Sequence, residues 1–233
     1  MRGPPSTWAL DKAAELNPAN LSYHPVLAPG KNGTLRMANS LSQLGTSPYK
    51  LWAFTTGSTV RCLNCHGDSR LGNPLSPPGA GDRLAPHAVV NRGILIENLR
   101  DRILKGPSEA YSAADFALCY VCHAEEPFVN TTGSSLYSNF GEHGRHLTQI
   151  ASFSGPSGES IDTDGAGHGN AICAECHFRT HGTTYAVDGQ TPASRLVNFG
   201  PNVVPNNGVI RFDAATQSCT LTCHGVAHDD WGY

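Results

Sequence analysis

The sequence Cys173-Ala174-Glu175-Cys176-His177 decides how this chain is organised, because its pattern of Cys-x-x-Cys-His recurs along the chain. All eight cysteines fall into four pairs, and a histidine follows the second cysteine of every pair. Motifs one to four are Cys62, Cys65 and His66; Cys119, Cys122 and His123; Cys173, Cys176 and His177; and Cys219, Cys223 and His224. Motif four is one residue wider than the others and reads Cys-x-x-x-Cys-His.

Cys-x-x-Cys-His is the attachment signature of c-type haem. Two thiols separated by two or three residues can bond the two vinyl groups on one edge of a porphyrin, and the next residue then places its imidazole below the iron. Paired cysteines also build zinc sites and disulfides, but neither requires a histidine directly after each pair. With only 11 histidines in 233 residues, chance placement is a poor explanation. The sequence therefore predicts four haem c groups, each with its iron.

Seven histidines remain once the four motif histidines are assigned as proximal iron ligands: His24, His87, His143, His146, His168, His181 and His228. Methionine, the common alternative ligand, occurs only at Met1 and Met37. Histidine is therefore predicted on both sides of all four irons. Such an iron has no open position for substrate, so we expect an electron carrier and not an enzyme.

The predicted distal iron ligands are His24, His143, His146, His181 and His228. His181 and His228 each lie four residues after a motif histidine, too close to reach the opposite face of the same iron, so a neighbouring haem is expected. His143 and His146 are three residues apart, which on a helix places them on one side, facing two adjacent haems. The alternative for each of these histidines is that it does not bind iron and instead forms a hydrogen bond at the surface or with a haem propionate. For His87 and His168 this alternative is favoured.

The fold class expected is mostly coil with few short α-helices and a small β-hairpin, organised around four covalently bound haems. Charged residues are only 15%, while 25 glycines and 16 prolines favour turns. The haems would supply the core that segments 66–90 and 152–170, which lack periodicity, cannot form alone. Two domains are expected, an N-terminal leader over 1–61 and a tetrahaem domain over 62–233. Helices are predicted over 6–17 and 94–105, with a capped helix from 112 into motif two and a hairpin within 196–212.

Composition also limits the function and the compartment. The net charge of −3 shows no basic excess for binding nucleic acid, and no apolar run approaches the length of a membrane span. Because haem is attached to this motif outside the cytoplasmic membrane, an exported protein is expected, extracellular or at the cell surface, with the periplasm as the alternative. Residues 1–20 lack a signal-peptide pattern, so the mature form is expected. Asp162 and Asp164 resemble half of a calcium loop, too little to predict a site.

Segments 116–123, 142–146, 173–181, 196–199 and 219–228, in this order, resemble the extracellular multihaem c-type cytochromes that polymerise into conductive filaments, especially the tetrahaem type. The resemblance covers about residues 110–230 well and 20–110 loosely, and His24-Pro25-Val26 is similar to a leader segment of that family. It implies a continuous row of haems and a histidine from one subunit that ligates a haem of the next, a role that falls on His24. The implied partners are copies of the chain in a helical filament, other redox cytochromes and extracellular electron acceptors.

Two other functions remain open at this point. One is a soluble, monomeric periplasmic tetrahaem shuttle. The other is a multihaem oxidoreductase subunit in which one haem is open to substrate. The low content of charged residues favours the polymer, because the cores of buried interfaces are depleted of charge.

Overall fold

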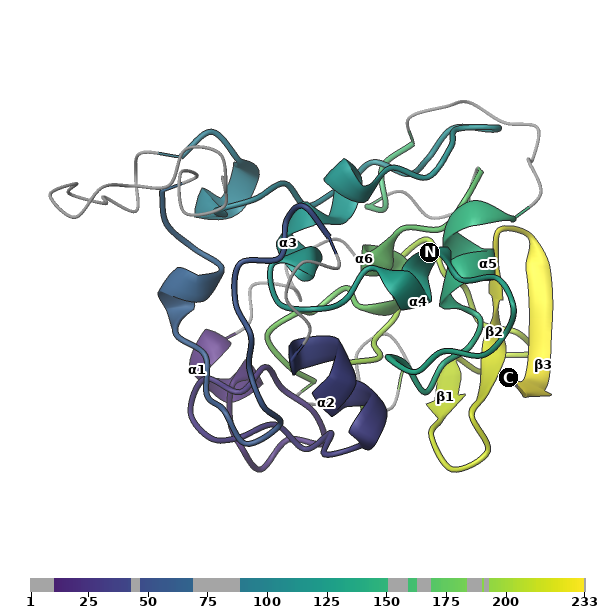
Figure 1. The fold of residues 1–233 in the computed structure, drawn as a ribbon. Helices are drawn as coiled ribbons and strands as arrows, with labels where there is room; N and C mark the ends of the chain where they lie inside the picture. The colour runs from purple at the N-terminus through teal and green to yellow at the C-terminus, as the bar shows by residue number, and fades with distance from the viewer. Residues whose placement is uncertain are drawn as a thin grey trace, which may run out of the picture.

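The computed structural model describes residues 11–42, 47–68, 89–150, 159–162, 169–183, 190 and 193–232. Most of these residues form turns, bends and irregular coil (Figure 1). Short helices occupy the N-terminal and central parts of the chain, and a small sheet lies at the C-terminal end. Within these ranges, no helix is long and apolar enough to cross a membrane.

The helices are single turns or little more. They are α1 (Lys12–Glu15), α2 (Leu35–Ser42), α3 (Ala117–Tyr120), α4 (Glu126–Val129), α5 (His143–Thr148) and α6 (Cys173–Cys176), with 3-10 turns at Cys62–Asn64, Arg92–Ile94 and Ala113–Phe116. Helices this short are not stable in isolation, so their packing in the folded chain must stabilise them. Several of them carry a motif or a predicted ligand, which fixes those residues in place.

The sheet has three antiparallel strands in the order β1 (Arg211–Asp213), β2 (Ser218–Cys223) and β3 (Val226–Gly232). Strands β2 and β3 are joined by His224 and Gly225, whose φ angles are 52° and 74°. Positive φ at both central positions is typical of the two-residue turns that match strand twist. Both cysteines of motif four therefore lie on one strand, and the motif histidine lies in the turn that follows it.

Two apolar clusters link consecutive motifs. The first contains Leu104, Phe116, Tyr120, Leu147, Ile161, Ile172 and Ala174, and Cys119 and Cys173 pack against it. The second contains Phe199, Val203, Ile210, Cys219 and Leu221, and Cys176 and Cys223 contribute to it. Motifs two and three thus share one cluster, and motifs three and four share the other.

The prediction of an amphipathic helix over 94–105 is wrong. A 3-10 turn ends at Ile94, where Gly93 and Ile94 both have positive φ, and the chain then continues without helix. The backbone N–H of Ile96 donates to the carbonyl of Cys65 at 3.0 Å, and that of Leu104 donates to Glu159 at 2.7 Å. These long-range bonds replace the helical ones, because tertiary contacts override local helix propensity.

The other expected elements are found in part. Of the helix predicted over 6–17, α1 is present and residues 1–10 lie outside the described ranges. Helical structure begins after Ser112 and reaches Tyr120, but the Ser112 side chain does not cap it. Asn207 and Gly208 form the predicted turn with positive φ, closed by a single bridge between Asn206 and Val209.

The hairpin predicted within 196–212 does not extend beyond that bridge. Val204 pairs with Thr222 instead, through two backbone hydrogen bonds of 2.9 and 2.7 Å. Strand β1 likewise pairs with β2. Residues of the predicted hairpin thus pair with the C-terminal strand β2, which was not predicted from the sequence, and not with each other.

Candidate haem-binding site

Motifs one to three share one local backbone conformation. In each, the N–H of the motif histidine donates to the carbonyl of the first cysteine, at 2.8 Å for His66, 3.0 Å for His123 and 2.8 Å for His177. This closes a helical turn, and residues three apart on a turn lie on the same side. The two thiols of each motif are therefore close enough together to face one edge of a single ring.

The cysteines of consecutive motifs are neighbours in space. Burial, with the nearby thiol of Cys119 as the next cause, raises the pKa of Cys65 to about 11. The side chains of Cys119 and Cys173 are hydrogen-bonded to each other. Burial also raises the pKa of Cys176, with Cys219 as the next contributor. Motifs one, two, three and four thus follow one another in space in the order of the sequence.

His66 of motif one faces His181, a predicted distal ligand. Their ring centroids are 6.1 Å apart and the ring planes differ by 2°. An iron held between two imidazoles by bonds of about 2 Å places the centroids roughly 6 Å apart. Nδ1 of His66 donates to the carbonyl of Gly93 at 3.0 Å, and Nδ1 of His181 lies 3.5 Å from Oε2 of Glu15. These contacts at Nδ1 reserve Nε2 as the ligand atom.

His177 of motif three faces His143 in a similar way. The centroids are 6.5 Å apart and the planes differ by 28°. Nδ1 of His177 donates to the carbonyl of Leu196 at 3.0 Å, and Nδ1 of His143 donates to Phe140 at 3.0 Å. Burial lowers the pKa of His143 to about 3, so its imidazole is neutral, which is the form that binds metals.

His24 lies near motif two within its own chain. Its N–H donates to the carbonyl of His181 at 2.9 Å, and its Nδ1 is hydrogen-bonded to the carbonyl of Thr180. Burial, with the nearby imidazole of His24 as the next cause, lowers the pKa of His123 to about 3. His24 and His181 are therefore adjacent, with His24 near motif two and His181 beside motif one. The role of His24 in a neighbouring subunit stays a prediction.

His224 of motif four has different surroundings from the other motif histidines. Its Nε2 lies 3.0 Å from Oε1 of Glu175, and both side chains are buried. Burial lowers the pKa of His224, but the carboxylate of Glu175 outweighs this effect and raises the pKa overall. Ligand atoms of Glu175, Cys223 and His224 all lie within 4.8 Å of one another. The structure thus brings a carboxylate to the nitrogen that would bind iron.

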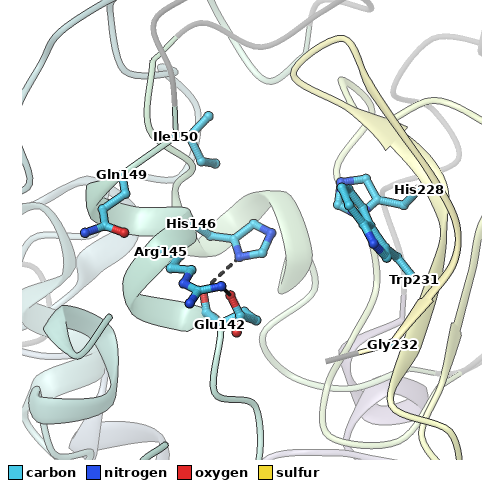
Figure 2. A pocket seen from close by; sticks show the side chains of 8 residues that line it. All are labelled: Glu142, Arg145, His146, Gln149, Ile150, His228, Trp231 and Gly232. Carbon is cyan, nitrogen blue, oxygen red and sulfur yellow. Dashed lines mark hydrogen bonds and ion pairs between the residues drawn. The ribbon is translucent and has the colours of Figure 1, made fainter. Parts of the chain in front are cut away.

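The two remaining predicted distal ligands face each other. His146 on α5 and His228 on β3 have ring centroids 6.5 Å apart, with planes that differ by 30°. Figure 2 shows the two rings on opposite sides of a pocket, which Arg145 and Trp231 also line. Neither histidine belongs to a cysteine motif.

Glu15, Lys50 and Glu175 are buried charged residues beside these sites that were not predicted from the sequence. Nζ of Lys50 donates to the carbonyls of Ser40 at 2.8 Å and of Cys122 in motif two. Glu175 stands inside motif three, but nothing in the sequence indicated that its carboxylate would meet His224 of motif four. His87, His168 and Asp164 lie outside the described residues, and Asp162 is paired with Arg102.

No family model matches this chain, and neither the curated proteins nor the solved structures contain a match to it. Its function is therefore inferred from the motifs and from the geometry of the facing histidines.

Proposed function

We propose that this chain is an electron carrier that holds four c-type haems and forms the repeating subunit of an extracellular conductive filament. The observation that carries the proposal is the pair of facing imidazoles at motifs one and three. In each pair, a motif histidine meets a histidine from a distant segment at 6.1 or 6.5 Å, the separation expected for two axial ligands.

The residues present fit the group at the first three motifs. Six cysteines would form the thioethers: Cys62, Cys65, Cys119, Cys122, Cys173 and Cys176. His66 with His181, and His177 with His143, would hold the iron from both sides, and His123 with His24 would do so at motif two. When bound, each haem iron supplies a one-electron couple. A fourth haem is proposed at motif four, although Cys219 and Cys223 lie along one strand there and not on one helical turn.

The protein's own groups keep the ligands in place and set their basicity. The carbonyls of Gly93, Leu196 and Phe140 each accept a hydrogen bond from Nδ1 of a predicted ligand. Such bonds orient the ring and make Nε2 a stronger donor, which favours the oxidised iron. Two imidazoles per iron also leave no position for substrate. Together these features support electron transfer at low potential over catalysis.

The contacts between consecutive motifs support a continuous path. Because Cys65 is near Cys119, Cys119 contacts Cys173 and Cys176 is near Cys219, porphyrins tethered at these residues would be close neighbours. Cys62 is exposed, so the first haem would lie near the surface, where an electron can enter or leave. A filament would extend this path from one copy to the next.

A monomeric tetrahaem shuttle is the second candidate, and the contacts of His24 favour it. In a filament built with a shared ligand, His24 would reach into the neighbouring subunit. Here His24 packs against Thr180 and His181 of its own chain. A chain that supplies its own ligands can carry its haems without a neighbour.

Three measurements on the native holoprotein test these proposals. Each thioether forms by addition of S–H across a vinyl C=C bond, so four haems add about four times 616 Da to the intact mass. Electron microscopy distinguishes thin regular filaments from dispersed particles. Reduced protein that binds carbon monoxide would have an open haem and would revive the oxidoreductase alternative, whereas an unmodified polypeptide mass would refute the haem proposal entirely.

A further inference from the structure

The pocket between α5 and β3 contains two histidines placed as an axial pair, although neither follows a cysteine motif. The centroids of His146 and His228 are 6.5 Å apart at 30° between planes. The corresponding values for His143 and His177 are 6.5 Å and 28°. The two pairs therefore have nearly the same geometry, and the same ligand chemistry applies to both.

Both rings are held in position by their neighbours. Nδ1 of His146 donates to the carbonyl of Glu142 at 2.8 Å, one helical turn earlier. The ring of His228 packs against Trp231 with its plane at 66° and a centroid distance of 4.9 Å. Figure 2 shows that His146 projects from α5 and His228 from β3 into the space between these elements. The hydrogen bond at Nδ1 makes Nε2 of His146 the atom that faces the pocket.

The pocket between the rings is large enough for more than a metal ion. Its volume is about 400 Å³, and Arg145, Gln149, Ile150 and Trp231 also line it. Ile150 and Trp231 offer apolar surface to a flat ring. Arg145 is paired at 3.2 Å with Glu142, which also lines the pocket, so a carboxylate at the edge of the ring would have to share or replace that pair. Arginine pairs well with carboxylates because its planar fork donates two parallel hydrogen bonds.

Two opposed imidazoles are a poor site for a bare zinc ion. Zinc in proteins prefers four ligands in a tetrahedron. Two nitrogens on opposite sides of a metal instead leave the positions around its equator to be filled, and the four nitrogens of a porphyrin fill them. The paired geometry therefore fits an iron porphyrin better than a bare zinc ion.

Motif four departs from the geometry that would let its own histidine take this role. Cys219 and Cys223 lie on strand β2, where a rise of about 3.4 Å per residue separates their Cα atoms by about 14 Å. In the other motifs the two cysteines share one helical turn. His224 is also directed to Glu175, with 3.0 Å between Nε2 and Oε1.

Motif four is nevertheless next to the pocket. On the sheet, Cys219 is paired with Trp231 and Leu221 with His228. Directly opposed residues of paired strands project from the same face of the sheet. The thiol of Cys219 therefore belongs to the face that carries His228 and Trp231, where it could tether a ring bound in the pocket.

We propose that His146 and His228 are the axial ligands of an iron porphyrin, at a site that uses no motif histidine. This proposal rests on the proposed function, since it assigns the ligands of one of its haems. The porphyrin is either the one tethered through motif four or a free haem, and the two sources share the same ligand chemistry.

The test compares four variants of the holoprotein: His146→Ala, His228→Ala, His224→Ala and Asp229→Ala. Electron paramagnetic resonance counts high-spin and low-spin ferric irons in each. We expect one low-spin iron to become high-spin, or one haem to be lost, in both His146→Ala and His228→Ala. His224→Ala is expected to retain that low-spin iron. Asp229→Ala, an exposed change next to His228 on β3, is the matched control and should resemble the unmodified protein.

A second variant tests the assignment if the alanine variants do not fold, and a solvent extraction identifies the source of the porphyrin. His228→Met retains an iron ligand, so this variant should stay low-spin with a raised reduction potential even if the alanine variant misfolds. Extraction with acidified organic solvent removes a free haem but leaves one held by thioethers, which distinguishes the two sources. Loss of a low-spin iron in His224→Ala, or unchanged spectra in both His146→Ala and His228→Ala, would overturn the assignment. A holoprotein without any haem would instead refute the proposed function itself.

Discussion

The imidazole rings of His66 and His181 are parallel within 2°, with 6.1 Å between their centroids. His66 belongs to motif one and His181 follows motif three, and each lies beside its own backbone bridge. Leu95 and His66 form one bridge, and Tyr23 pairs with Gly182 beside His181. A metal bound between the rings would therefore connect two segments that are already held at the right separation.

Replacing His181 by alanine should affect motif one alone. One iron of the holoprotein is expected to change from low-spin to high-spin and to bind carbon monoxide when reduced, because it loses its sixth ligand. Optical and electron paramagnetic resonance spectra measure this directly. The matched variant His181→Met should remain low-spin and titrate at a higher potential, since thioether sulfur favours the reduced iron. If His181→Ala keeps every iron low-spin, the pairing with His66 is wrong.

Glu15 should lower the reduction potential of the same haem. Its buried side chain lies 3.5 Å from Nδ1 of His181 and is paired with Lys12 at 2.8 Å. A carboxylate at that position stabilises the ferric state and strengthens the imidazole as a donor. Glu15→Gln is expected to raise the potential by on the order of 59 mV, which is a tenfold change for a one-electron couple.

Lys12→Gln is the control for Glu15→Gln in a spectroelectrochemical titration. It removes the opposite charge, so it should shift the potential slightly downward. The exposure of the Lys12 side chain, 58%, makes its effect the smaller one, because solvent screens it. Equal shifts of the same sign in both variants would show that the carboxylate does not act on His181.

Local chemistry was readable from the sequence, but the pairing of segments was not. The motifs predict which residues form each turn, because the spacing of cysteines and histidine is a property of a few adjacent residues. The helix predicted over 94–105 does not form, because the backbone N–H groups of Ile96 and Leu104 donate to distant carbonyls, those of Cys65 in motif one and of Glu159. The side chains of both residues are buried. Periodicity in the sequence does not reveal such partners.

Motif four shows the same limit at a candidate site. Its sequence differs from the others by one inserted residue, and the same haem-binding role was predicted for it. The structure instead continues strand β2 through both cysteines, because β1 and β3 pair with it on either side. The carboxylate that meets His224 comes from Glu175, a residue whose position in motif three gave no indication of this contact.

Gly144 should not tolerate a side chain, although it lies inside α5. A Cβ atom there would be 2.0 Å from the backbone oxygen of Asn130. Gly144→Ala would normally stabilise a helix by about 1 kcal/mol, but the clash should displace α5 and lower the free energy of unfolding. Urea unfolding monitored by the haem absorbance measures the change. At Gly33 an added Cβ meets nothing within 4 Å, so Gly33→Ala should be neutral or slightly stabilising.

Lys105 should be essential for stability because its ammonium group is buried among acids. The side chain is 0% exposed, and its Nζ lies 2.6 Å from Asp115 and 3.4 Å from Glu109. Lys105→Met leaves these carboxylates with Arg100 as their remaining partner, and we expect a loss of about 1–3 kcal/mol in unfolding free energy. Arg92→Gln breaks the exposed pair with Asp101 and should cost less than about 1 kcal/mol. Similar losses in both variants would contradict this reading.

Glu109 should make the protein less stable in acid. Hydrogen bonds from Arg100 lower the pKa of Glu109 to about 2, whereas an unfolded chain has a glutamate pKa of about 4.3. The ionised carboxylate therefore stabilises the fold above pH 4.3 or so, and this contribution is lost as the pH falls toward 2. Glu109→Gln should flatten the decline of the urea midpoint over that range. Burial raises the pKa of Glu97, so Glu97→Gln should steepen the decline instead, since protonation of that group favours the folded state. Parallel pH profiles for the two variants would show that neither carboxylate is linked to folding in this way.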